Sequence, residues 1–261
     1  PEKELLKALR NNEGNPLLHF TLGVYYYEVF LAYHDQWKKG SKETMSLFYY
    51  HFMEAYKLNK KSAMSCYAIS YYYQNRRSNR KAEKLLHEAL TLDPKYPAAH
   101  YNLAYSYNLQ DSITLALKHA QKAFDHYRIK SFKADAALMC GVLSSDMKNY
   151  EKAIKWLLIA DAMTPGKVVV YETLLKCYLA LNKEKEALLI TKNLYAYDWR
   201  TARIFNNILD SYITENKEKL LQSFLVNEIN TERSDQEYLG FTYMHLAQLY
   251  IHIDQKEKAS E

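Results

Sequence analysis

Alanine recurs at a near-constant interval along this chain. One series, with steps of 34, 37 and 34, consists of Ala82, Ala116, Ala153 and Ala187. A second, with steps of 34, 34 and 37, consists of Ala55, Ala89, Ala123 and Ala160. Two helices approach closely only where their side chains are small, so each series predicts a line of helix–helix contacts. Repetition at this interval indicates stacked supersecondary units.

A tyrosine series follows the same period and consists of Tyr26, Tyr73, Tyr107, Tyr178, Tyr212 and Tyr250. Large rings at these positions are expected to fill the notches that the alanines leave. Only 6 Gly and 5 Pro occur in 261 residues, so few positions can break a helix. With 48% hydrophobic residues, the chain has enough apolar material for a core. One helix pair cannot cover its own apolar face, so the units are predicted to be stable only as a stack.

The pattern resembles the tetratricopeptide repeat over nearly the whole chain. His19-x2-Leu22-Gly23-x2-Tyr26 matches the first helix of that repeat, with His in the place of Trp. The second helix and its exit are matched by Ala82, Ala89 and Pro94, and again by Asn149-Tyr150-x2-Ala153, Ala160 and Pro165. The resemblance implies an all-α fold, a right-handed superhelix (α-solenoid) of about seven antiparallel helix pairs.

We predict a single array over residues 1–261, in which residues 1–12 form a cap or remnant helix. The predicted units lie near residues 16–62, 63–96, 97–133, 134–167, 168–201, 202–239 and 240–261. The sixth unit is degenerate, because Leu221 and Glu228 stand where alanines are expected. A three-residue excess over 126–133 predicts a longer turn there. The chain is predicted to stop inside the second helix of a truncated last unit, as a fragment of a longer protein.

Charge and cysteine content exclude several classes of function. The net charge of +5 is spread over 35 basic and 30 acidic residues, so no nucleic-acid partner is expected. No apolar stretch is long enough to predict a membrane segment. Cys66, Cys140 and Cys177 have neither disulfide nor zinc spacing. We expect buried free thiols in a reducing compartment, which favours a cytoplasmic location.

Catalytic motifs are missing from the sequence. No HExxH, CxxC, GxGxxG or GxxxxGK[ST] pattern occurs. His245 and His252 are seven residues apart, too far along a helix to share a metal. We therefore predict no enzymatic activity, no catalytic residue, no cofactor and no metal site.

The resemblance implies that the first helices line a concave face. In the first half of the chain this lining is aromatic and able to form hydrogen bonds, and Tyr provides contact area at low entropic cost. The candidate partner-binding residues are Tyr27, Met64, Tyr67, Tyr71, Asn75, Tyr101, Tyr105 and Asn108. We predict a protein–protein interaction scaffold that binds a peptide or partner protein on this Tyr-lined face. The alternative is that these rings only pack on one another.

In the second half the inward set is charged, and consists of Glu172, Lys176, Arg203, Asn206 and Asp210. It predicts either a solvated wall or a polar subsite that orients a ligand. Some members of the family hold a C-terminal carboxylate with Lys, Asn and Arg. That mode is not expected here, because Asp135 stands where a Lys is needed.

Two other functions stay open on the sequence. Phe48, Tyr49, Tyr50, Phe52 and Tyr56 are apolar on more than one helix face, which predicts self-association as a homodimer. The chain could also be the regulatory repeat region of a bacterial signalling or transcription protein. The basic run at 76–81 is interpreted as a solvated turn, because no aromatic stacking pattern accompanies it.

Overall fold

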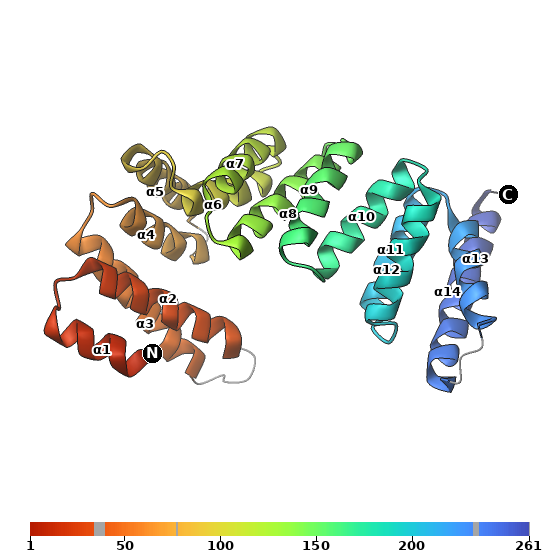
Figure 1. The fold of residues 1–261 in the computed structure, drawn as a ribbon, viewed down its shortest axis with the longest axis horizontal. Helices are drawn as coiled ribbons and strands as arrows, with labels where there is room; N and C mark the ends of the chain where they lie inside the picture. The colour runs from red at the N-terminus through yellow and green to blue at the C-terminus, as the bar shows by residue number, and fades with distance from the viewer. Residues whose placement is uncertain (34–39, 77, 232–234, 261) are drawn as a thin grey trace. The chain divides into compact units, whose positions relative to one another are not determined.

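The structure, a computed structural model, describes residues 1–33, 40–76, 78–231 and 235–260, in which every regular element is an α-helix (Figure 1). The helices form two compact units, residues 1–128 and 129–261. The first unit contains α1 (Glu2–Asn11), α2 (Pro16–Tyr33), α3 (Gly40–Leu58), α4 (Ala63–Asn75), α5 (Asn79–Leu92), α6 (Pro97–Asn108) and α7 (Ile113–His126). The second contains α8 (Lys130–Asp146), α9 (Tyr150–Met163), α10 (Val168–Ala180), α11 (Glu184–Tyr197), α12 (Ala202–Thr214), α13 (Glu218–Ile229) and α14 (Gln236–Ser260).

Within each unit, every helix packs against the helix that follows it in sequence. First helices also contact one another, as α2 contacts α4 and α10 contacts both α8 and α12. The predicted all-α solenoid of helix pairs is therefore confirmed. That the pairs continue as one right-handed array over the whole chain stays a prediction.

The small residues lie where the helices come closest. The alanines of both sequence series are almost completely buried, each at most 1% exposed. Glycine takes this role at two points. A Cβ on Gly23 would lie 2.3 Å from Cδ1 of Phe52, and one on Gly141 would lie 2.7 Å from Cδ2 of Leu157. Neither site has room for a methyl group, so the helix pairs α2–α3 and α8–α9 depend on these glycines.

The turns within four helix pairs share one backbone feature. Asp111, Lys148, Asn182 and Asn216 have φ between 53° and 58°, the left-handed region. Asn and Asp tolerate this conformation better than most residues, and Lys does not. A single left-handed residue therefore ends the first helix of each of these pairs and starts the reversal.

The last helix differs from its prediction. We expected a new unit near residue 240 with a second helix before the end, but α14 is one helix from Gln236 to Ser260. The next position in the left-handed series, 34 residues after Asn216, is Tyr250. A bulky ring is disfavoured at positive φ, and no Gly or Pro lies nearby, so the helix continues.

The predicted long turn over 126–133 is also absent. Only residues 127–129 separate α7 from α8, and α8 begins at Lys130. The extra residues lengthen α8 to 17 residues, against 12 in α6. Because nothing in 130–133 breaks a helix, the excess is helical rather than looped.

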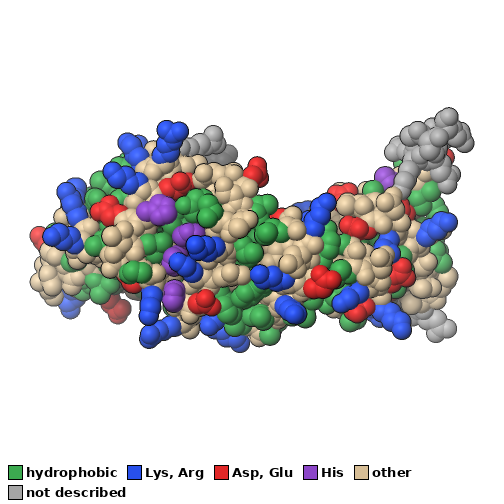
Figure 2. Space-filling view, turned by 90° about the horizontal axis from the view of Figure 1, so that it is seen from above, with side chains coloured by type: hydrophobic (Ala, Val, Ile, Leu, Met, Phe, Trp, Pro, Cys, Tyr) green, Lys and Arg blue, Asp and Glu red, His purple; other side chains and the backbone are tan. Residues whose placement is uncertain are grey.

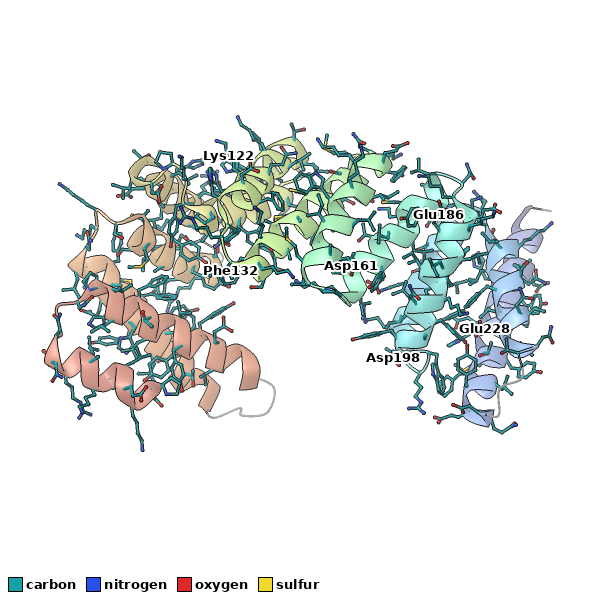
Figure 3. The ribbon with its side chains drawn as sticks, in the orientation of Figure 1. Lys122, Phe132, Asp161, Glu186, Asp198 and Glu228 are labelled. Carbon is teal, nitrogen blue, oxygen red and sulfur yellow. The ribbon has the colours of Figure 1, made fainter. Side chains whose placement is uncertain are left out.

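In the degenerate sixth unit, larger side chains occupy the two buried positions where alanines were expected. Leu221 is fully buried and Glu228 is 7% exposed. Glu228 lies on α13 beside α14 (Figure 3), where its Oε2 accepts a hydrogen bond of 2.5 Å from the Tyr238 hydroxyl. A buried carboxylate needs such a partner. The alanine notch is thus replaced by a polar contact between α13 and α14.

At the other end of the chain, α1 covers one side of the first helix pair. Leu5, Leu6 and Leu9 pack on the cluster that contains Leu22 and Tyr26. The Tyr26 hydroxyl donates a hydrogen bond of 2.8 Å to Oε1 of Glu2. Burial, followed by this hydrogen bond, raises the pKa of Tyr26 to about 12.

Candidate functional site

A groove of about 540 Å³ lies between α4 and α6 in the first unit. Its lining consists of Tyr71, Gln74, Asn79, Tyr101, Asn102, Tyr105, Ser106 and Leu109. None of these side chains carries a formal charge. Tyr105 is 52% exposed and Leu109 is 63% exposed, so both offer apolar surface to a ligand. The groove can form hydrogen bonds and bury apolar groups at the same time.

One wall of the groove is held by a chain of tyrosines. The Tyr71 hydroxyl is hydrogen-bonded to that of Tyr27, and the two rings meet edge to face with centroids 4.9 Å apart. Tyr67 lies behind Tyr71, with ring centroids 5.7 Å from Tyr96 and 6.4 Å from Tyr71. Burial raises the pKa of Tyr67 to about 12, and burial and the bond to Tyr27 raise that of Tyr71. Both hydroxyls are therefore neutral at any physiological pH.

The opposite rim is fixed by polar contacts to the second helices. Ser106 donates a hydrogen bond of 2.6 Å to Oε1 of Glu83, and Gln110 donates to the same oxygen. Across the groove, Asn102 Nδ2 lies 3.5 Å from Oε1 of Gln74. That contact is long, and the Asn102 side chain is also hydrogen-bonded to the Tyr67 hydroxyl, so the Gln74 amide is the less constrained of the two.

No known sequence family and no curated protein sequence matches the chain. Solved structures do resemble it. YrrB, described as a tetratricopeptide-repeat protein with an unusual peptide-binding site, is 18% identical over 72% of this chain and 95% of its own, with a TM-score of 0.57. PilF of Pseudomonas aeruginosa is 14% identical over 87% of this chain and 99% of its own, with a TM-score of 0.59.

A third structure is that of a tetratricopeptide-repeat protein from Parabacteroides merdae. It is 15% identical over 93% of this chain and 91% of its own, with a TM-score of 0.52. The chain has the tetratricopeptide-repeat fold. The rows of alanine that predicted it are those that the structure buries between helices.

The candidate binding residues on this tetratricopeptide-repeat scaffold fall into three groups. Tyr71, Tyr101 and Tyr105 line the groove. Tyr27 and Tyr67 support Tyr71 from behind and do not line it. Met64 and Asn108 are half-buried outside the lining, and the side chain of Asn75 lies outside the described part of the structure.

The predicted partner-binding residues did not include five residues of the lining, which are Gln74, Asn79, Asn102, Ser106 and Leu109. Their spacing contained the signal, since Tyr101, Tyr105 and Leu109 follow each other at i, i+4 and i+8 on one face of α6. We predicted that Asn108 would line the groove, but the neighbouring Leu109 lines it instead. An error of one position on a helix rotates the side chain by about 100°, enough to leave the groove.

The second unit has a groove of about 290 Å³ along α8, α10 and α12. From the predicted charged set, Glu172, Lys176 and Asp210 line it. Arg203 is beside it, with Nη1 3.4 Å from Oε1 of Glu172. Asn206 instead accepts a hydrogen bond of 3.0 Å from Gln248 on α14.

Histidines form two similar pairs in the first unit. Nδ1 of His19 lies 2.9 Å from Nδ1 of His51, and Nδ1 of His100 lies 3.0 Å from Nδ1 of His119. Nε2 of His19 and of His100 lies near a backbone carbonyl, that of Glu13 and Pro94 respectively. A carbonyl only accepts, so these Nε2 atoms carry the proton and the partner histidine donates through Nδ1.

Burial, followed by the charge of the partner histidine, lowers the pKa of His51 and of His119 to about 4. Figure 2 shows histidines gathered on the displayed face of this unit. Among the described residues, no group of three or more His, Cys, Asp or Glu is placed to hold a metal ion. Burial thus favours the neutral form of His51, His100 and His119 within these pairs.

In the basic run at 76–81, residues 76 and 79–81 are exposed, as the solvated-turn interpretation predicted, but two of its cations also lie over aromatic rings. The Arg76 guanidinium lies 4.8 Å from the Tyr72 ring centroid, and the Lys81 ammonium lies 5.4 Å from that of Tyr73. Both rings belong to the end of α4, and Arg77 lies outside the described residues. The aromatic partners that the sequence analysis did not find are thus supplied by the preceding helix.

The aromatic residues of α3 are mostly covered within the chain. Phe48 and Phe52 are at most 4% exposed, and Tyr49 stacks edge to face on Tyr72 of α4. Tyr50 is the exception, with 54% of its surface exposed. α2 and α4 therefore provide the second covering surface that the sequence pattern required. None of the described helices has both the length and the apolar character to cross a membrane.

Proposed function

We propose that the chain is a protein–protein interaction scaffold that binds an extended peptide segment of a partner in the groove between α4 and α6. The observation that carries this proposal is the uncharged lining of amides and tyrosines, of which Tyr105 is about half exposed. Amides on facing helices match the donors and acceptors of a peptide backbone, and the rings match its side chains. YrrB, which shares the fold, is described as having a peptide-binding site.

Preorganisation supports the same proposal. Tyr71 is fixed by Tyr27, and Ser106 is fixed by Glu83. Side chains that are ordered before binding lose less conformational entropy when a ligand arrives. The proposal includes no catalytic role. We also propose a cytoplasmic location, because the three buried cysteines are free thiols, which are typical of a reducing compartment.

A peptide-display selection against the full chain tests the proposal. Selected peptides should bind the wild type and bind Tyr105→Ala about tenfold or more weakly, since exposed aromatic anchors dominate such interfaces. Tyr197→Ala, an exposed ring of the second unit, is the matched control and should bind normally. Failure to select any peptide, or equal binding to Tyr105→Ala, would contradict the proposal.

Homodimerisation is the alternative that the aromatic α3 suggested. Because its rings pack on α2 and α4, the peptide groove is the better supported function. Sedimentation equilibrium separates the two. A chain that is dimeric at micromolar concentration, and becomes monomeric in Tyr50→Ser, would favour self-association through the exposed ring of α3.

A further inference from the structure

The groove of the second unit differs in charge from the peptide groove of the first. Its apolar walls include Val142 of α8 and Val169 of α10. Its charged lining consists of three carboxylates and one ammonium, those of Asp146, Glu172, Asp210 and Lys176. The groove therefore joins apolar walls to an excess of negative charge.

Most of these charges are compensated. Nζ of Lys176 lies 3.7 Å from Oδ1 of Asp146. Oε1 of Glu172 accepts a hydrogen bond of 2.7 Å from Asn207 and lies 3.4 Å from Arg203. The Asp210 carboxylate has neither a hydrogen bond nor an ion pair with any residue that the structure describes. One exposed carboxylate in the groove thus lacks a cation.

We propose that this groove binds a lysine or arginine side chain of a partner peptide. Such a side chain has an aliphatic stem that can pack on the two valines and a cationic head that can reach Asp210. An acidic segment would meet three carboxylates, and the single ammonium is already paired with one of them. Charge complementarity of this kind acts mainly on specificity and association rate.

The inference does not depend on the α4–α6 groove. The two grooves lie in different units and share no residue. A single partner with an uncharged segment and a basic segment could use both, but either site can be tested alone. Tyr105→Ala should therefore leave binding at the second groove unchanged.

The test uses the full chain and fluorescence anisotropy at low salt. The probe is a labelled peptide of about nine residues with two arginines in a Ser and Val background. Its matched comparison carries Gln at both arginine positions, and a third peptide carries Glu. We expect the arginine peptide to bind at least about fivefold more tightly than the glutamine peptide, and more weakly as salt rises.

Variants of the groove locate the effect. Asp210→Asn should weaken binding of the arginine peptide about three- to fivefold, the size expected of one exposed ion pair. Asp210→Lys should weaken it further. The control Glu186→Gln removes an exposed carboxylate from α11 (Figure 3). This helix contributes no residue to the lining of the groove, so binding should be unchanged. Helical circular dichroism confirms that each variant is folded.

Four results would overturn the inference. They are equal binding of the arginine and glutamine peptides, tighter binding of the glutamate peptide, an equal loss in Asp210→Asn and Glu186→Gln, and no peptide binding at all. Spermidine serves as a small organic cation. If it binds in an Asp210-dependent way and the arginine peptide does not, the site takes a free polyamine and the peptide proposal is wrong.

Discussion

The two units are built by the same packing rule and present different chemistry. In the first unit the groove is lined by uncharged tyrosines and amides, and in the second by carboxylates and a lysine. The buried contacts beneath them are alike, with small residues at the closest approaches of the helices. The rows that make the fold and the positions that line the grooves therefore lie on separate faces, and one can vary while the other stays fixed.

The units also differ in what they bury beneath those faces. The first contains two histidine–histidine contacts, His19 with His51 and His100 with His119. In the second unit, His245 stacks on Phe205, and its Nδ1 lies 2.8 Å from the Tyr195 hydroxyl. Polar residues in a core respond to pH and to substitution in ways that the surrounding alanines do not.

The largest expected effect is acid destabilisation. Burial lowers the pKa of His51, His119 and His245 to about 4, so these rings are neutral in the folded chain. The unfolded chain takes up protons below a pH of about 6.5, so stability falls from there and the loss is complete near pH 4. For a ring as buried as His51 the loss is on the order of 2–3 kcal/mol.

Amide hydrogen exchange at pH 7.5 and pH 5 measures the loss of stability of each unit separately. The first unit contains three of the four histidines whose pKa is lowered, His51, His100 and His119, and should lose more protection than the second. Between pH 7.5 and 8.5 neither unit should change in stability through these rings. An equal loss in both units at pH 5 would show that the histidine pairs do not set the difference.

The next effect tests what the units share. Gly23→Ala and Gly141→Ala each place a methyl group against a buried side chain, Phe52 or Leu157, and should each cost about 1–3 kcal/mol. Denaturant unfolding measures the loss. Gly240→Ala is the control, because a Cβ there would have no atom of another part of the chain within 4 Å. This variant should gain up to about 1 kcal/mol of stability. A loss in only one unit would break the parallel between them.

A smaller effect compares one position of the tyrosine row in each unit. Tyr212 is fully buried and its hydroxyl lies 2.8 Å from Oγ1 of Thr191. Tyr107 is half-buried and its hydroxyl lies 3.1 Å from Nε2 of the exposed His87. Tyr212→Phe should cost about 1 kcal/mol and Tyr107→Phe less than about 0.5 kcal/mol, measured by thermal unfolding. The reverse order would mean that the exposed hydrogen bond between Tyr107 and His87 contributes more to stability than the buried one of Tyr212.

The smallest effect concerns the left-handed turns. Lys148 and Asn182 occupy equivalent turns at φ of 58° and 56°. Lys148→Asn should stabilise the chain by about 0.5 kcal/mol, and Asn182→Lys should destabilise it by a similar amount. Melting temperatures of the two single variants and of the double variant decide this. If both changes have the same sign, backbone conformation is not the cause.

The sequence was sufficient to predict the helix pairs, because the alanine rows report directly on helix contacts. It failed where local backbone chemistry decides, at the uninterrupted α14 and at the extended start of α8. Neither depends on the period of the repeat. Tyr250 prevents a left-handed turn, and residues 130–133 contain nothing that ends a helix.

The grooves were predicted in part for a related reason. A helical period identifies a face, so Tyr71, Tyr101 and Tyr105 were found. It does not say which rings on that face pack behind others, and Tyr27 and Tyr67 proved to be supports. Nor does it show contacts between residues far apart in sequence, such as Glu83 with Ser106, which fix one rim.

The bond between the Tyr27 and Tyr71 hydroxyls has a mechanical consequence. Tyr71 is a wall of the groove on one side and an attachment point for α2 on the other. A ligand that displaces this ring must pull on a helix that it never touches. Displacement of Tyr71 would therefore move α2 through Tyr27. A label on α2 would then report ligand binding in the groove without blocking it.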